Sequence, residues 1–181
     1  MVPVHLVAPL CLLLATRAGP AAPDNAPAGA APAASPAAGL LDPSAAWRGA
    51  RWGMTVAEVL GAFPGEARRL EPAEQLADGK VIAAGIESHA IGALGFRVRF
   101  LFEGGRLALV SLKSLPARLA EGRDYDALRQ RLAAESGQPG EERPLDGSFD
   151  YREVRFAAGA TAVDLKFLQG TLVLLFHPAG R

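Results

Sequence analysis

The chain contains few of the residues that carry covalent or metal chemistry. Its 181 residues include one cysteine, Cys11, and three histidines, His5, His89 and His177. Cys11 lies inside an apolar N-terminal run, so the rest of the chain has no thiol for a disulfide, a catalytic thiolate or a cysteine metal site. His89 and His177 lack a third ligand at metal-binding spacing. We therefore predict no metal site and no cofactor.

An excess of charge of one sign is also absent. Lys+Arg and Asp+Glu each number 19, which leaves a formal net charge of +0. No field of one sign draws such a protein to nucleic acid or to anionic lipid. We therefore predict no nucleic-acid partner.

Long hydrophobic runs are missing as well. LVAPLCLLLA, at 6–15, is an apolar run of ten residues, which is too short to span a bilayer. Small residues follow it, as in a secretory signal peptide, although no Lys or Arg precedes it. We predict a signal peptide over 1–18, a periplasmic or secreted protein, and no integral span in the mature chain. A cytoplasmic chain and a retained anchor stay open as alternatives.

The next segment is built from residues that pack poorly. Residues 19–39 contain ten Ala, five Pro and three Gly. Such a composition offers nothing to bury, and its prolines interrupt helices. We expect a disordered tether over 19–46 and a folded domain over 47–181.

The folded part alternates helix and strand patterns. Thr55-Val-Ala-Glu58 is a capping box at the start of a helix that Pro64-Gly65 ends, and 66–80 is expected to be loop or irregular helix. A second helix is predicted over 124–136, with Asp124 as its cap. Alternating apolar runs predict strands, and a Gly-Gly turn predicts a hairpin between the second and third of them. The predicted strands cover 81–90, 95–102, 107–115, 151–157, 161–168 and 171–177.

The order helix, strands, helix, strands indicates an internal duplication. The two helix starts, at Thr55 and Asp124, are 69 residues apart. We predict an α+β fold of two tandem helix-plus-antiparallel-strand units, about 47–115 and 116–181. Their strands would form one sheet with the helices on one face.

Trp52-Gly53-Met54, followed by T-x-x-E-V at 55–59, resembles a known group of periplasmic proteins. With the repeated helix and hairpin, this pattern is similar to the fold of β-lactamase-inhibitor protein and, for a single unit, to outer-membrane assembly lipoproteins of the SmpA/OmlA type. The chain has neither the cysteine pairs of the inhibitor nor the lipobox of the lipoproteins. The resemblance implies a non-catalytic module whose open sheet face binds another protein. From the residues themselves, Trp52-Gly53-Met54 is interpreted as a structural corner between strand and helix.

The predicted strands place polar residues on the face away from the helices. If Phe96, Val98 and Phe100 face the helices, their neighbours along the strand point outward. Such a face is usual for a sheet that is solvated on one side, so plain surface stays an alternative to a docking site. The candidate partner-binding residues are Arg97, Arg99, Tyr151, Glu153, Arg155, Asp164 and Lys166.

The main functional prediction is a non-catalytic envelope or secreted protein-binding module, acting as an inhibitor or assembly adaptor on another envelope protein. The first alternative is a carrier of a small ligand or lipid, with a cavity lined by Phe96, Phe100, Val154 and Phe167. The second is a hydrolase, which would require His89 or His177 beside a carboxylate in a cleft. No sequence motif for nucleophilic catalysis is present, so no catalytic residue is predicted.

Overall fold

The computed structural model describes residues 39–143 and 151–180. The predicted signal peptide and most of the predicted tether lie outside these ranges. The helices of the described part are α1 (Val56–Ala62) and α2 (Gly122–Ser136). Its strands are β1 (Arg68–Gln75), β2 (Val81–Ile91), β3 (Leu94–Glu103), β4 (Arg106–Ser114), β5 (Glu141–Glu142), β6 (Tyr151–Ala158), β7 (Thr161–Leu168) and β8 (Thr171–Pro178).

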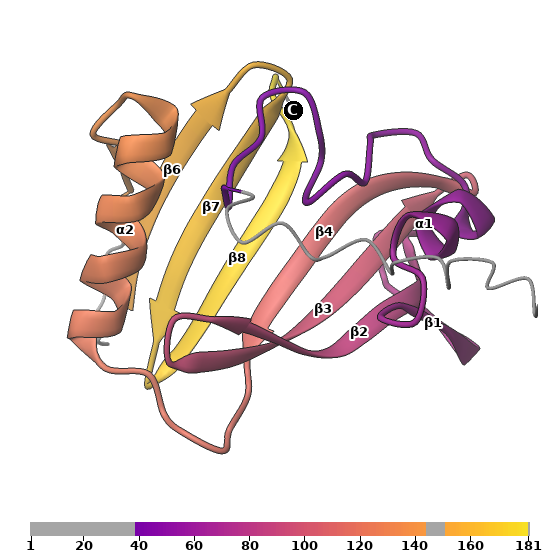
Figure 1. The fold of residues 1–181 in the computed structure, drawn as a ribbon, viewed down its shortest axis with the longest axis horizontal. Coiled ribbons are helices and arrows are strands. Elements are labelled where there is room, and N and C mark those ends of the chain that lie inside the picture. Colours follow the sequence, from indigo (N-terminus) through magenta and orange to yellow (C-terminus); the bar gives the residue numbers. More distant parts are fainter. Residues whose placement is uncertain (1–38, 144–150, 181) are drawn as a thin grey trace, which may run out of the picture. The chain divides into compact units, whose positions relative to one another are not determined.

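The strands form one antiparallel sheet (Figure 1) in the order β1-β2-β3-β4-β8-β7-β6-β5. The predicted hairpin across Gly104-Gly105 joins β3 to β4. In the middle of the sheet Val110–Lys113 of β4 pairs with Val173–Phe176 of β8. The predicted α+β class with an antiparallel sheet is therefore confirmed.

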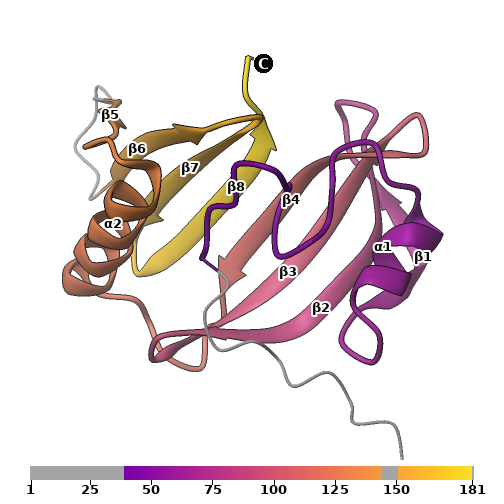
Figure 2. The ribbon, with the colours of Figure 1, turned by 45° about the horizontal axis from the view of Figure 1, so that its top comes forward.

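Both helices pack on the same face of the sheet (Figures 1 and 2). Val59 of α1 and Leu132 of α2 are fully buried in one apolar core, together with alternate residues of the strands such as Phe96 and Phe176. Residues at alternate strand positions point to opposite faces, so the other face carries the remaining side chains. Among the described residues no helix covers that opposite face, and no helix has the length and apolarity to cross a membrane.

The folded domain was predicted to start at Trp47, but residues N-terminal to Trp47 already pack on the core. Leu40 and Leu41 are buried, and Leu41 N donates to Glu135 of α2. The segment then runs between the two helices over the core (Figure 2) and ends at Trp47, whose ring contacts Phe63. The boundary is displaced because an apolar Leu-Leu pair follows the Ala/Pro-rich stretch and finds a site on the core.

Two local predictions at the helix starts have different outcomes. The capping box at Thr55 is present, with Glu58 N donating to Thr55 Oγ1 and Glu58 Oε2 accepting from Thr55 N. The second helix starts earlier than predicted, at Gly122, and its N-cap is Glu121 rather than Asp124. Asp124 instead accepts the Glu121 amide from within the first turn, which is the reciprocal half of a capping box.

The prediction of loop or irregular helix over 66–80 was wrong, because β1 occupies Arg68–Gln75 at one edge of the sheet. Nearly all of its residues are exposed, so it lacks the alternation that identifies a half-buried strand. Edge strands tolerate charge and proline, since one side of the backbone has no partner strand. The short β5 at the other edge was also not predicted.

Candidate functional site

The candidate site is the face of the sheet opposite the helices, called the open face below. All seven candidate residues lie on it, because their neighbours along the strands belong to the core. Two of the seven, Glu153 and Asp164, are nevertheless buried. The seven residues form two groups, one on β3 and one on β6 and β7.

The first group surrounds a carboxylate that the sequence analysis did not single out, Glu87 of β2. Arg68 Nη2 and Arg99 Nη2 each lie 3.0 Å from Glu87 Oε1, and Arg97 Nε lies 3.3 Å from Oε2. The hydrogen bond from Arg68, with the charge of Arg99, lowers the pKa of the Glu87 carboxyl against the opposing effect of burial. One carboxylate therefore orients three guanidinium groups.

The second group centres on two buried carboxylates. The Tyr151 hydroxyl donates to Glu153 Oε2 at 2.5 Å, and Lys166 Nζ lies 3.4 Å from the same oxygen. Burial and this hydrogen bond raise the pKa of Tyr151 to about 12. Tyr151 therefore stays a neutral hydrogen-bond donor at physiological pH.

Asp164 and Arg155 form the best-defined ion pair of the open face. Arg155 donates through Nε to Asp164 Oδ1 at 2.6 Å and through Nη2 to Oδ2 at 3.0 Å. Burial alone would raise the pKa of Asp164, but the hydrogen bonds and charge of Arg155 outweigh it and the pKa is lowered. This two-point geometry leaves the guanidinium little rotational freedom.

The two histidines after the predicted signal peptide lie on opposite faces of the sheet. His89 packs edge-on against the Trp47 ring on the helix side, with ring centroids 5.1 Å apart. His177 lies on the open face, where its Nε2 is 3.4 Å from Asp164 Oδ2 and its Nδ1 is 3.1 Å from Pro178 O. Within the described ranges, no cluster of three His, Cys, Asp or Glu residues is placed to hold a metal ion.

The contact between His177 and Asp164 meets one condition of the hydrolase alternative. Both Asp164 oxygens already accept from Arg155, and no hydroxyl of a described residue is hydrogen-bonded to the imidazole. The arrangement stabilises charge and brings no nucleophile to the histidine. The hydrolase stays an untested prediction.

The side chains expected to line a carrier's cavity belong to the core. Phe96, Phe100 and Val154 are fully buried and Phe167 is 3% exposed. Phe100 stacks on Phe63 with ring centroids 5.4 Å apart. The carrier also stays a prediction.

The interpretation of Trp52-Gly53-Met54 as a corner agrees with the structure. Gly53 has a φ of +81°, and its amide donates to Leu107 O at 3.0 Å. Trp52 and Met54 pack partly buried against the core, and Trp52 Nε1 donates to Thr161 of β7 at 3.0 Å. This segment therefore links the N-terminal end of α1 to β7, in the second half of the sheet.

Sequence reasoning missed Glu87, His177 and Lys113 as members of the open face. Counting residue pairs outward from the Gly-Gly turn gives an approximate partner for each residue of this hairpin, but without a bulge this count pairs Arg97 with Leu112. A register shift between Leu101 and Phe102 places Lys113 opposite Arg97 instead. Only the pairing of the strands reveals that shift.

The chain was compared with models of known protein families, with characterised proteins and with solved structures, and none of these comparisons found a match.

Proposed function

We propose that this protein is a non-catalytic protein-binding module of the cell envelope or of the secreted fraction, acting through the open face. The observation that carries the proposal is the pair of ordered charge groups around Glu87 and around Glu153 and Asp164. Arginine and tyrosine are the residue types that most often anchor protein interfaces.

Ion pairing on this face favours recognition because it restricts mobile side chains before a partner arrives. Arg99 is held by Glu87 and Arg155 by Asp164, so part of the entropy of ordering them is lost on folding and not on binding. The partly exposed ion pairs of Glu87 add little to the free energy of folding. Their arrangement on one uncovered face therefore favours a role in binding.

We also propose that the sheet is built from two tandem units, about 47–115 and 116–181. Each half has a helix followed by four strands, and the last strands of the halves, β4 and β8, pair in the middle. This order supports a likeness to the tandem fold of β-lactamase-inhibitor protein, where the sheet face binds another protein. Export rests on the signal-like pattern of residues 1–18.

The test is photo-crosslinking of the full chain in its own host. A crosslinking amino acid would replace Lys113 or Ala157, exposed on the open face, or Gln130, exposed on α2 as the matched control. We expect one envelope protein to be captured from both open-face positions and not from Gln130.

A second form of the test carries Arg97→Ala, Arg99→Ala and Tyr151→Ala together with the crosslinker at Ala157. Loss of these anchors should reduce capture by more than about ten-fold. Capture from Gln130 alone, or no capture in a preparation that turns over a substrate, would contradict the proposed function. Undiminished capture by the triple variant would move the interface away from these anchors.

A further inference from the structure

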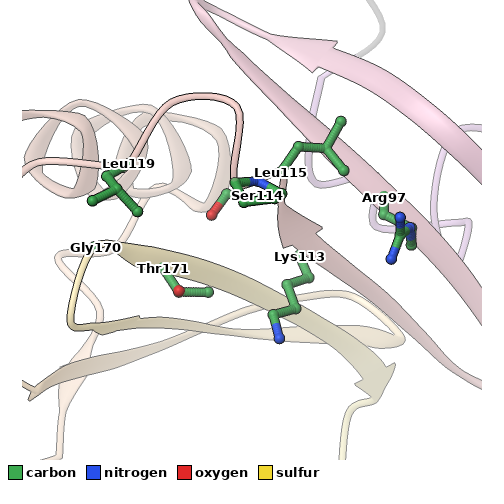
Figure 3. A pocket seen from close by; sticks show the side chains of 8 residues that line it. Arg97, Lys113, Ser114, Leu115, Leu119, Gly170 and Thr171 are labelled. Atoms are coloured by element: carbon green, nitrogen blue, oxygen red, sulfur yellow. The ribbon is translucent and has the colours of Figure 1, made fainter.

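A pocket of about 310 Å³ lies at the end of the open face where β3, β4 and β8 meet the loop before α2. Figure 3 shows Arg97 and Lys113 extending from neighbouring strands and Leu119 on the loop side of the pocket. Leu115, Pro116 and Thr171 also line the pocket. The pocket therefore combines two cationic groups with an aliphatic wall.

The two cations lie directly opposite each other on paired strands, with Arg97 and Lys113 as Cα partners. Like charges at such positions destabilise an antiparallel pair. Arg97 shares Glu87 with Arg68 and Arg99, and in the part of the chain that the structure describes the Lys113 ammonium has no ion-pair or hydrogen-bond partner. An anion placed in the pocket would relieve this repulsion.

The apolar wall is exposed but anchored. Leu119 is 66% exposed and Leu168, at the neighbouring end of β7, is 44% exposed. The loop that carries Leu119 is fixed to the β7–β8 turn by a hydrogen bond of 2.8 Å from Ala120 N to Gly170 O. Leu119 on the loop and Leu168 on β7 therefore add exposed apolar surface next to the two cations of the pocket.

From these contacts we infer that the pocket binds a segment of the partner protein in which a carboxylate side chain stands beside an aliphatic or aromatic one. The carboxylate lies between Arg97 and Lys113, and the apolar side chain packs on Leu115 and Leu119. This inference rests on the proposed function and names the chemistry that the open face recognises.

The size of the pocket favours a segment of a protein over a whole small ligand. A volume of about 310 Å³ is at the lower end of the range for small-molecule sites, which are also more enclosed. Two side chains of a longer chain fit that volume, and the rest of the segment continues over the open face. A free fatty acid is the competing occupant.

The experiment selects binders from a library of random eight-residue peptides displayed on phage, using the full chain. We expect the enriched peptides to carry Asp or Glu within two positions of Leu, Ile, Phe or Trp. Lys113→Gln should lower the affinity for the best synthetic peptide about three- to ten-fold, and the double variant with Arg97→Gln should bind that peptide more weakly still. Arg69→Gln, exposed on the edge strand β1 and outside the pocket, is the matched control and should leave the affinity within about two-fold.

Each other outcome overturns the inference in a recognisable way. Enriched peptides without an acidic residue, or peptides insensitive to the Lys113 and Arg97 variants but sensitive to Tyr151→Ala, place recognition elsewhere on the open face and keep the proposed function. Displacement of the peptides by decanoate, with direct decanoate binding, assigns the pocket to a lipid-like acid. No enrichment, together with no crosslinked partner, removes the inference and the proposed function together.

Discussion

At the scale of single residues, the open face is organised by carboxylates that are themselves poorly accessible. Glu153 and Asp164 are 9% and 6% exposed, yet both are surrounded by cations or hydroxyl donors. Removing one member of such a pair leaves a charge without compensation in a poorly solvated place. Substitutions of these carboxylates therefore affect both the stability of the fold and the orientation of the cationic and hydroxyl side chains around them.

Asp164→Asn should lower the free energy of unfolding by about 1–3 kcal/mol at pH 7, because Arg155 loses the carboxylate charge and one of its two acceptor oxygens. The lowered pKa of Asp164 means that its contribution is present above the unfolded-state value near pH 4 and is lost as pH falls through the folded-state pKa. Urea unfolding at several pH values measures both effects. The matched control is Asp126→Asn, whose ion pair with Arg152 is long and exposed and should contribute little. Equal losses in the two variants would count against a special role for Asp164.

His89 gives a second pH dependence near neutrality. Burial, then the charge of Arg48, lowers its pKa, while Glu66 acts in the opposite direction. The unfolded state therefore binds a proton more readily, so the stability contributed by neutral His89 is lost as pH falls below about 6.5. We expect the free energy of unfolding of the His89→Gln variant, measured in urea, to change less between pH 7.5 and pH 5.5 than that of the unsubstituted chain. Parallel pH profiles for the two proteins would show that His89 contributes nothing to this slope.

At the scale of elements, the segment over residues 39–50 completes the layer that covers the sheet between α1 and α2. Leu40 and Leu41 are buried beside α2, and Thr161 Oγ1 donates to Ala45 O at 2.7 Å. The turn between β6 and β7 also holds this segment, since Ala160 N donates to Pro43 O at 3.2 Å. A segment of irregular backbone therefore covers the part of the core that lies between the two helices.

Gly159→Ala tests this contact, with Gly104→Ala as a matched control. Both glycines have positive φ, +57° and +55°, so alanine strains the backbone by about 1 kcal/mol at either position. A Cβ at position 159 would also lie 2.5 Å from Pro43 O, whereas nothing lies within 4 Å of one at position 104. Thermal unfolding should show a loss for Gly159→Ala that exceeds the control by about 1–3 kcal/mol. Indistinguishable losses would mean that residue 43 moves away at no cost.

At the scale of the whole molecule, the two halves share one sheet and one core. β4 and β8 pair in the middle, and the buried residues of both halves belong to a single apolar cluster. The chain has a formal net charge of +0, but its ion pairs place cations on the open face around buried or shared carboxylates. The overall charge balance therefore coexists with local groups of cations on the open face, and these are the groups that we propose bind an acidic segment of a partner.

Leu132→Ala tests whether the halves unfold together. Leu132 of α2 is fully buried, so its truncation should cost about 2–4 kcal/mol. Both tryptophans, Trp47 and Trp52, lie in the first half. If the shared core makes unfolding cooperative, Trp fluorescence and far-UV circular dichroism should shift to the same lower urea midpoint. A fluorescence midpoint that does not move would show two independently unfolding halves.

Local patterns were enough to predict the α+β class, most strands, the capping box at Thr55 and the open-face position of residues such as Arg97 and Arg155. They suffice because helix and strand periods are properties of neighbouring residues, and burying one face of a strand defines the other. Partners distant in the chain decided the rest. The pairing of β4 with β8, the register shift that brings Lys113 opposite Arg97, and the packing of Leu40 and Leu41 against α2 depend on surfaces that exist only after folding.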